Sequence, residues 1–199
     1  MKITNCTIED FEEIDKLYKQ ARALQTQLKM VVWPTFSEAM IHQEIAEKRQ
    51  FKALIDNKIV CVWAVAFSDP LIWEEKNKDP AIYIHRIATN NTYRGHNCVK
   101  KIVNWVDNYP EKNKYKYIRL DTVGNNAGLI KHYRKCGFQF LGIATLKETK
   151  GLPAHYSNAS VCLKKPLDEN TTHQFTKHRF HSFGKSIGCL PENYRQRGT

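Results

Sequence analysis

The sequence predicts a single mixed α/β domain in which one layer of sheet is flanked by helices. Segments with strand and helix character alternate in the order β-α-α-β-β-β-α-β-α-β-β, which is typical of α/β architecture. The 199 residues, 42% of them apolar, are enough for one hydrophobic core. We therefore expect a domain over residues 1–165 and a polar, basic, poorly ordered tail over residues 166–199.

A strand at residues 2–5 and two helices are expected in the first quarter of the chain. Thr7 followed by Asp10 is a hydroxyl cap with a carboxylate three residues later, a pattern that begins helices. Ser37 is suited to cap a second helix that runs to about Lys48. Apolar residues recur at helical spacing in both segments, so each helix is predicted to pack one face against the core.

The rest of the sheet is predicted from apolar segments separated by polar turns. Residues 59–66 are apolar on both faces, which indicates a central strand. The elements expected after residue 50 are a β-hairpin over 51–66, a polar loop over 68–80, a strand, loop and helix over 81–108, a strand over 115–123, a helix over 126–135, and an antiparallel pair over 138–146 and 155–164.

The composition argues against several classes of protein. No apolar run approaches the roughly 20 residues that span a bilayer, and the N-terminus lacks the apolar stretch of a signal peptide, so a cytoplasmic protein is expected. Six scattered cysteines without a Cys-x-x-Cys pair argue against a disulfide scaffold and against a cysteine zinc site. The tail histidines and Cys189 match no zinc spacing, so no metal is predicted.

The net charge of +11 is the unusual feature of the composition. Such a charge favours phosphorylated cofactors and, in other proteins, nucleic acid. The lysines are spread along the chain rather than gathered in one block, which is typical of an ordinary charged surface. We therefore do not expect a nucleic-acid partner.

Two blocks of sequence carry the functional signal. In the first, an apolar strand leads into Arg94-Gly95-His96-Asn97 at the start of an amphipathic helix. Free backbone N–H groups and the positive end of the helix meet there, which suits a phosphate or pyrophosphate. The second block runs from Asn126 to Gly137-Phe138 and forms a short helix ended by glycine, with Tyr133 on the same face as Leu129 and Cys136.

The two blocks and the order of elements resemble the GNAT superfamily of acyl-CoA N-acetyltransferases. The first block corresponds to the family's Q/R-x-x-G-x-G/A cofactor motif, in which Gly95 matches while Thr92 and Asn97 depart. Asparagine is the best substitute for glycine where a positive φ is required, so the departure at Asn97 is compatible with the motif. The second block resembles the family pattern N-x-x-A-x-x-x-Y-x-x-x-G-F, with Leu129 in place of the alanine.

The resemblance implies a GNAT fold, with a mixed, mostly antiparallel central sheet, and acetyl-CoA as co-substrate. It further implies that the backbone amides of Arg94, Gly95, His96, Asn97 and Cys98 bind the pyrophosphate of coenzyme A, that the backbone of Ile87 and Thr89 pairs with the pantetheine arm like an added strand, and that Asn126 helps to hold that arm. The family's tyrosine, here Tyr133, protonates the departing thiolate, which suits a phenol with a pKa near 10.

His85 is the candidate base. It lies two residues before Ile87 on a predicted strand, so the period of two places both side chains on one face, near the reaction centre. In the arylalkylamine branch of the superfamily, a histidine at this strand position relays the amine proton through water. Histidine titrates nearest neutral pH, which suits a base that deprotonates an ammonium ion.

The acceptor and two alternative functions remain open at this stage. The carboxylates Glu74, Glu75 and Asp121 would attract a cationic amine, and Trp33, Phe36 and Trp73 lie in loops that line the acceptor site in GNAT folds. The departures at the cofactor motif allow a non-catalytic acyl-CoA-binding regulatory domain, and the basic charge allows a nucleic-acid-binding module. The resemblance suggests a small-molecule or peptide amine as the acceptor and a homodimer that forms through edge strands. No membrane partner is expected.

Overall fold

The computed structural model describes residues 1–109, 111, 114–124, 126–144 and 160–167. Seven strands form one sheet in the order β1-β2-β3-β4-β5-β7-β6. Only β4 and β5 pair in parallel, and all other neighbours are antiparallel. The strands are β1 (Lys2–Asn5), β2 (Gln50–Ile55), β3 (Lys58–Ala66), β4 (Ala81–Thr89), β5 (Tyr117–Val123), β6 (Gln139–Ala144) and β7 (Ser160–Pro166). The predicted mixed, mostly antiparallel sheet is therefore confirmed.

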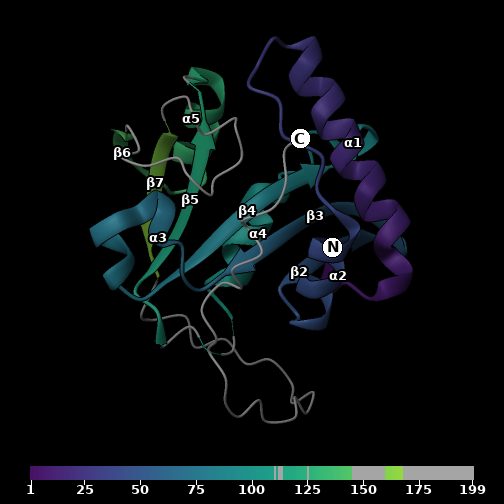
Figure 1. Cartoon of the computed structure of the whole chain (residues 1–199), viewed down its shortest axis with the longest axis horizontal. Coiled ribbons are helices and arrows are strands. Elements are labelled where there is room, and N and C mark those ends of the chain that lie inside the picture. Colours follow the sequence, from purple (N-terminus) through teal and green to yellow (C-terminus); the bar gives the residue numbers. More distant parts are fainter. Residues whose placement is uncertain (110, 112–113, 125, 145–159, 168–199) are drawn as a thin grey trace.

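Helices cover both faces of this sheet (Figure 1). The α-helices are α1 (Phe11–Gln27), α2 (Glu38–Ala46), α3 (Pro70–Trp73), α4 (Cys98–Val106) and α5 (Ala127–Lys135), and short 3-10 turns lie at η1 (Ile8–Asp10), η2 (Glu74–Lys78) and η3 (Asn91–Tyr93). Buried side chains of α4 and α5 form one core with β2 to β5 and β7, whereas those of α1 and α2 form a second core on the opposite face.

The first two helices begin as the sequence predicts. The Asp10 carboxylate accepts a hydrogen bond from the backbone N–H of Thr7 at 2.7 Å, and the Ser37 hydroxyl accepts one from the backbone N–H of Met40 at 3.2 Å. Each bond satisfies a backbone donor that the helix itself leaves unpaired. None of the helices in the described ranges is long and apolar enough to cross a membrane.

Strands β4 and β5 remain together over only part of their length. Their paired positions run from Ala81 with Tyr117 to Tyr83 with Arg119, and beyond them the two strands diverge (Figure 1). Among the described residues, the second half of β4 thus has no hydrogen-bonded strand on its β5 side. Because unpaired strand edges bind extended chains through their free N–H and C=O groups, this split in the sheet is where an extended ligand fits.

A β-bulge interrupts β4 at the same place. Val62 pairs with Ala88 but Ala64 pairs with His85, so two β4 residues, Arg86 and Ile87, lie opposite one β3 residue. Arg86 has φ +52°, in the left-handed region that non-glycine residues rarely adopt.

The bulge overturns the expectation that His85 and Ile87 share a face. Ile87 packs with the core under α4 and α5, whereas His85 stacks on Tyr83, which belongs to the cluster of α3 on the other side of the sheet. A single extra residue reverses the alternation of side chains along a strand. His85 therefore lies on the face opposite to Ile87.

The segment predicted as a polar loop over residues 68–80 contains structure of its own. Pro70 occupies the first turn of α3, a position where its missing N–H costs nothing. Ile72 and Trp73 are 5% and 2% exposed, and they pack with Tyr83 in a third cluster that covers one face of β4 and β5. The loop predicted over 68–80 thus includes two short helical segments and buried apolar side chains.

At the C-terminal end, Pro166 and Leu167 are part of the described structure. Strand β7 ends at Pro166, and the buried Leu167 donates its backbone N–H to the carbonyl of Lys116 at 3.0 Å. The tail predicted over residues 166–199, with its histidines and Cys189, lies outside the described residues from position 168 onward.

Candidate active site

The loop predicted to bind pyrophosphate is an open turn at the start of α4. Gly95 has φ +85° and Asn97, the residue that precedes the helix, has φ +55°. The left-handed conformation expected of Asn97 is thus confirmed. Residues 94–97 are exposed, and the first amide of the helix to bond back inside it is that of Lys101, to the carbonyl of Asn97 at 3.1 Å. The preceding amides of the helix are free for an anion.

Cys98 lies directly beneath this loop, in the core. It contacts Cys61 and Thr89, and the Cys61 sulfur lies 3.5 Å from the hydroxyl oxygen of Thr89. The hydrogen bond from the Cys61 thiol lowers the pKa of Cys98 to about 7, and the charge of Lys101 acts in the same direction. The side chain of Thr89 is therefore engaged with the core.

Tyr133 is 9% exposed and packs on the α4/α5 face of the sheet, with its ring edge-on to Phe138 at 6.1 Å between centroids. Burial raises the pKa of Tyr133 strongly, and the negative charge of Asp121 raises it further. The phenol therefore remains protonated at neutral pH and can act as a proton donor. Asp121 belongs to β5, one of the two strands that border the split, and its charge acts on Tyr133.

Asn126 caps α5 rather than projecting freely. Its Oδ1 accepts the backbone N–H of Leu129 at 2.9 Å, and its Nδ2 lies 3.4 Å from the sulfur of Met30. The side chain thus joins α5 to the segment that follows α1. This capping bond fixes the start of the helix that carries Tyr133.

His85 lies between two carboxyl groups on the α3 side of the sheet. Its Nε2 is 3.6 Å from Oδ2 of Asp69, and its Nδ1 is 3.7 Å from Oδ1 of Asp121. One ligand-type atom from each of the three residues lies within 4.8 Å of the others. Since Asp69 precedes α3 and the other two residues belong to β4 and β5, the cluster joins three separate elements at the start of the split.

Burial governs the protonation of this cluster. Burial raises the pKa of Asp69 to about 8, and the negative charge of Asp121 adds to the rise. Burial lowers the pKa of His85 to about 3, and the nearby guanidinium groups of Arg86 and Arg49 lower it further. At neutral pH the imidazole is neutral and Asp69 mostly holds a proton.

The sequence did not single out Asp69. An aspartate before proline is a common helix start, so its carboxyl has a ready structural explanation in the sequence. The geometry of the carboxyl falls short of a capping hydrogen bond, although the nearby backbone N–H of Ile72 works against the rise in its pKa. Its Oδ2 is buried without a hydrogen-bond partner among the described residues. A buried carboxyl oxygen without a donor is uncommon and calls for an explanation.

The three loop aromatics Trp33, Phe36 and Trp73 pack against the core. Trp33 and Phe36 pack edge-on or nearly so against Tyr18 at 6.3 and 5.0 Å between centroids, and Trp73 packs on Tyr83 at 5.8 Å. Of the acidic candidates, Asp121 joins the His85 cluster, whereas the exposed Glu75 pairs with Lys78 on η2.

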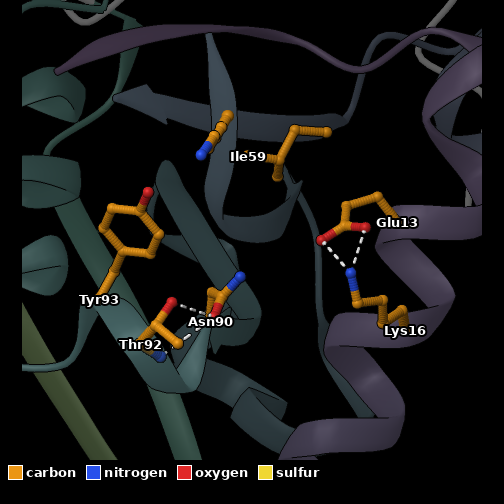
Figure 2. Close-up of a pocket in the computed structure, with 7 residues that line it drawn as sticks. Glu13, Lys16, Ile59, Asn90, Thr92 and Tyr93 are labelled. Carbon is orange, nitrogen blue, oxygen red and sulfur yellow. Dashed lines mark hydrogen bonds and ion pairs between the residues drawn. The ribbon is translucent and has the colours of Figure 1, made fainter. Parts of the chain in front are cut away.

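A separate pocket of about 430 Å³ lies between α1 and the approach to the cofactor loop (Figure 2). Its lining residues are Glu13, Lys16, Lys58, Ile59, Asn90, Thr92 and Tyr93. Glu13 and Lys16 form an ion pair at 2.9 Å across its wall. The pocket contains neither Tyr133 nor any member of the His85 cluster, so it adjoins the anion loop without being the reaction centre.

The sequence profile of the Acetyltransferase (GNAT) family matches residues 12–138, which is more than half of the chain and includes both functional blocks. The chain therefore belongs to the GNAT family of acetyltransferases. The uncharacterized N-acetyltransferase YesJ of Bacillus subtilis (strain 168) is 30% identical over 77 residues, which make up 37% of this chain. The match spans 41% of that relative, less than half of its length.

Solved structures share the fold at low sequence identity. A GNAT-family acetyltransferase of Listeria monocytogenes 4b F2365 has a TM-score of 0.66 and 20% identity, with 83% of this chain and 94% of that chain covered. The NatB acetyltransferase complex bound to CoA and MES contains a chain with a TM-score of 0.62 and 14% identity, with 84% and 100% covered. These likenesses confirm the GNAT fold.

Proposed function

We propose that this protein is an acetyl-CoA-dependent N-acetyltransferase that acts on a primary amine. The observation that carries the proposal is the split between β4 and β5, which has Tyr133 on one face and the His85 cluster on the other. A thioester held in the split is then accessible to an amine from the α3 side, while the leaving sulfur meets a proton donor on the α5 side.

Coenzyme A would be held by backbone rather than by charge alone. The amides of Arg94, Gly95, His96, Asn97 and Cys98 suit the pyrophosphate, since this loop is exposed and opens a helix. The β4 backbone at Ile87 and Thr89 suits the pantetheine arm, because this half of the strand has no partner in β5. Asn126 contributes by fixing the start of α5.

The transfer proceeds by direct attack. The amine nitrogen bonds to the thioester carbonyl carbon, the carbonyl oxygen takes up negative charge, and an N–H of the β4 backbone stabilises that oxyanion. The C–S bond then breaks and Tyr133 donates its proton to the thiolate. His85 lies on the amine side, beside Asp69. Holding both substrates side by side supplies a large share of the acceleration.

The proposal is tested in two steps, first by acetyl-CoA binding and then by acetyl transfer. The thermal midpoint is measured with acetyl-CoA in excess and with ATP as a control for general anion binding. At 100 times Kd a specific ligand adds about 2.7 kcal/mol, which is on the order of 5–10 °C for a chain of this size. Release of CoA thiol is then followed over a panel of peptide N-termini, lysine, polyamines and small amines.

A shift with acetyl-CoA alone, followed by thiol release with at least one amine, is the expected result. Equal shifts with ATP and acetyl-CoA would indicate a non-specific basic surface. Acetyl-CoA binding without transfer to any amine would leave the non-catalytic acyl-CoA-binding domain as the better description.

A further inference from the structure

We propose that Asp69 is the base that removes the proton from the acceptor's ammonium group, with Nε2 of His85 as a second hydrogen-bond acceptor and Asp121 as the residue that orients the imidazole. The inference rests on the proposed function and deepens it, because it assigns the proton acceptor to a residue that neither the family pattern nor the sequence had indicated.

One oxygen of the Asp69 carboxyl, Oδ2, is buried without a hydrogen-bond partner in the described part of the chain. Asp69 is 7% exposed, and its Oδ2 has no hydrogen-bond partner among the described residues. The 3.6 Å between this oxygen and Nε2 of His85 exceeds a hydrogen bond, so the two acceptors lie close together without satisfying each other, and a donor between them is within reach of both. A single N–H donor placed there would satisfy both, which is how a positively charged amine would bind.

The backbone of Asp69 is held in place on both sides of the residue. The Asn77 side-chain oxygen accepts the backbone N–H of Asp69 at 2.7 Å and the hydroxyl of Tyr83 at 2.8 Å. The carbonyl of Asp69 accepts the backbone N–H of Trp73 at 3.0 Å. Asp69 is thereby fixed to both α3 and β4, and such prior positioning is what a catalytic carboxylate requires.

The groups beside Asp69 lie at the opening of the split between β4 and β5. The last paired residues of β4 and β5 are Tyr83 and Arg119, and His85 and Asp121 each lie two residues further along. They meet across the opening of the split with 3.7 Å between Nδ1 and the Asp121 oxygen. An imidazole hydrogen on Nδ1 that faces the negative charge of Asp121 leaves the Nε2 lone pair directed toward the side of Asp69.

Charges around the cluster decide which group keeps the proton. His85, Asp121 and Tyr83 lie around the Asp69 carboxyl, and burial with the Asp121 charge brings its pKa to about 8. The guanidinium groups of Arg86 and Arg49 act on His85 and keep it neutral. A proton that leaves the amine therefore goes to Asp69 in preference to the imidazole.

The protons balance over the whole reaction. The ammonium group gives one proton to the Asp69 carboxylate and becomes a neutral amine, whose lone pair forms the new N–C bond. As the C–S bond breaks, the thiolate takes the Tyr133 proton, and the second proton lost by the nitrogen restores the phenol. Asp69 then releases its proton to solvent past His85, whose side chain is 20% exposed.

The test is the pH dependence of kcat for the wild type, Asp69→Asn and the control Glu75→Gln, with the best amine of the panel at saturation. Glu75 belongs to the same segment but its side chain is 84% exposed, so its loss should leave kcat unaltered. We expect wild-type kcat to rise with pH through about 8. Asp69→Asn should lower kcat by on the order of 100-fold or more and remove that rise.

Asp69→Asn should also keep the thermal shift with acetyl-CoA, which shows that the fold and the cofactor site are intact. Asp69→Glu should restore part of the rate together with the pH-dependent rise. A variant Asp69→Asn that keeps the wild-type rise in kcat would overturn the assignment of Asp69 while leaving the acetyltransferase intact. A wild type that binds acetyl-CoA but acetylates no amine would overturn both.

Discussion

Replacing Asp69 by asparagine should stabilise the protein at neutral and alkaline pH, because asparagine avoids the free-energy cost of ionising a buried carboxyl. Asp69 has an ordinary pKa of 3.8 and a native pKa of about 8. Between these values the native state binds a proton that the unfolded state has lost, so stability falls as pH rises, by about 1.4 kcal/mol per pH unit. Below pH 4 both states are protonated, and above pH 8 the loss is complete.

The interval spans about four pH units, which sets an upper limit of about 6 kcal/mol. Water entry and relaxation of the site reduce such penalties in real proteins, so we expect about 2–4 kcal/mol. Asparagine keeps the shape of the side chain and never ionises. The difference in unfolding free energy between Asp69→Asn and the wild type should therefore be small at pH 4, grow through pH 6, and level off above pH 8.

Urea unfolding at a series of pH values from 4 to 9 measures this difference directly. Glu75→Gln is the matched control, because the exposed Glu75 has no burial penalty to relieve. Curves for Asp69→Asn and wild type that run parallel over the whole range would refute the reasoning, since the carboxyl would then titrate alike in both states.

Three further predictions concern the proton donor, the loop and the thiol beneath it. Tyr133→Phe should lower kcat by on the order of 100-fold with little change in the Kd for acetyl-CoA, whereas the control Tyr109→Phe, three residues past the end of α4, should change neither. Full turnover in Tyr133→Phe would remove Tyr133 from the mechanism. Asn97→Ala should cost about 1 kcal/mol in urea unfolding and weaken acetyl-CoA binding, because alanine is strained at φ +55°, while Asn97→Gly should be tolerated. Iodoacetamide at pH 7 should label Cys98 before Cys6, whose pKa burial raises to about 12, and acetyl-CoA should slow that labelling in peptide mapping.

Periodicity in the sequence was sufficient to predict most of the sheet and the main helices. The alternation of side chains along β4 could not be predicted at Arg86, because a bulge is a local departure from alternation that the residue types do not indicate. Arginine with φ +52° is uncommon, and nothing in the neighbouring sequence predicts it. The consequence was large for the site, since one extra residue moved His85 to the opposite face from Ile87.

Asp69 escaped prediction for a different reason. A pattern can show that a carboxyl is present, but its protonation depends on burial and on distant charges, which come from tertiary structure. The partners His85 and Asp121 are 16 and 52 positions away in the chain, and only the sheet brings them together. By contrast, Asn97 was predictable because the requirement for a positive φ is local to the loop.

The bulge and the site depend on one another through Arg86. Its guanidinium group pairs with the buried Glu44 and lies over the ring of Phe36, 5.0 Å from the centroid. A buried ion pair of this kind stabilises a fold little relative to apolar replacements, so its main consequence here is positional. By anchoring Arg86 on the α2 side, the pair keeps β4 bulged at the point where the strand parts from β5. His85 follows the regular alternation from Tyr83, and the bulge after it turns Ile87 to the opposite core. One backbone irregularity thus separates the acceptor side of the split from the cofactor side.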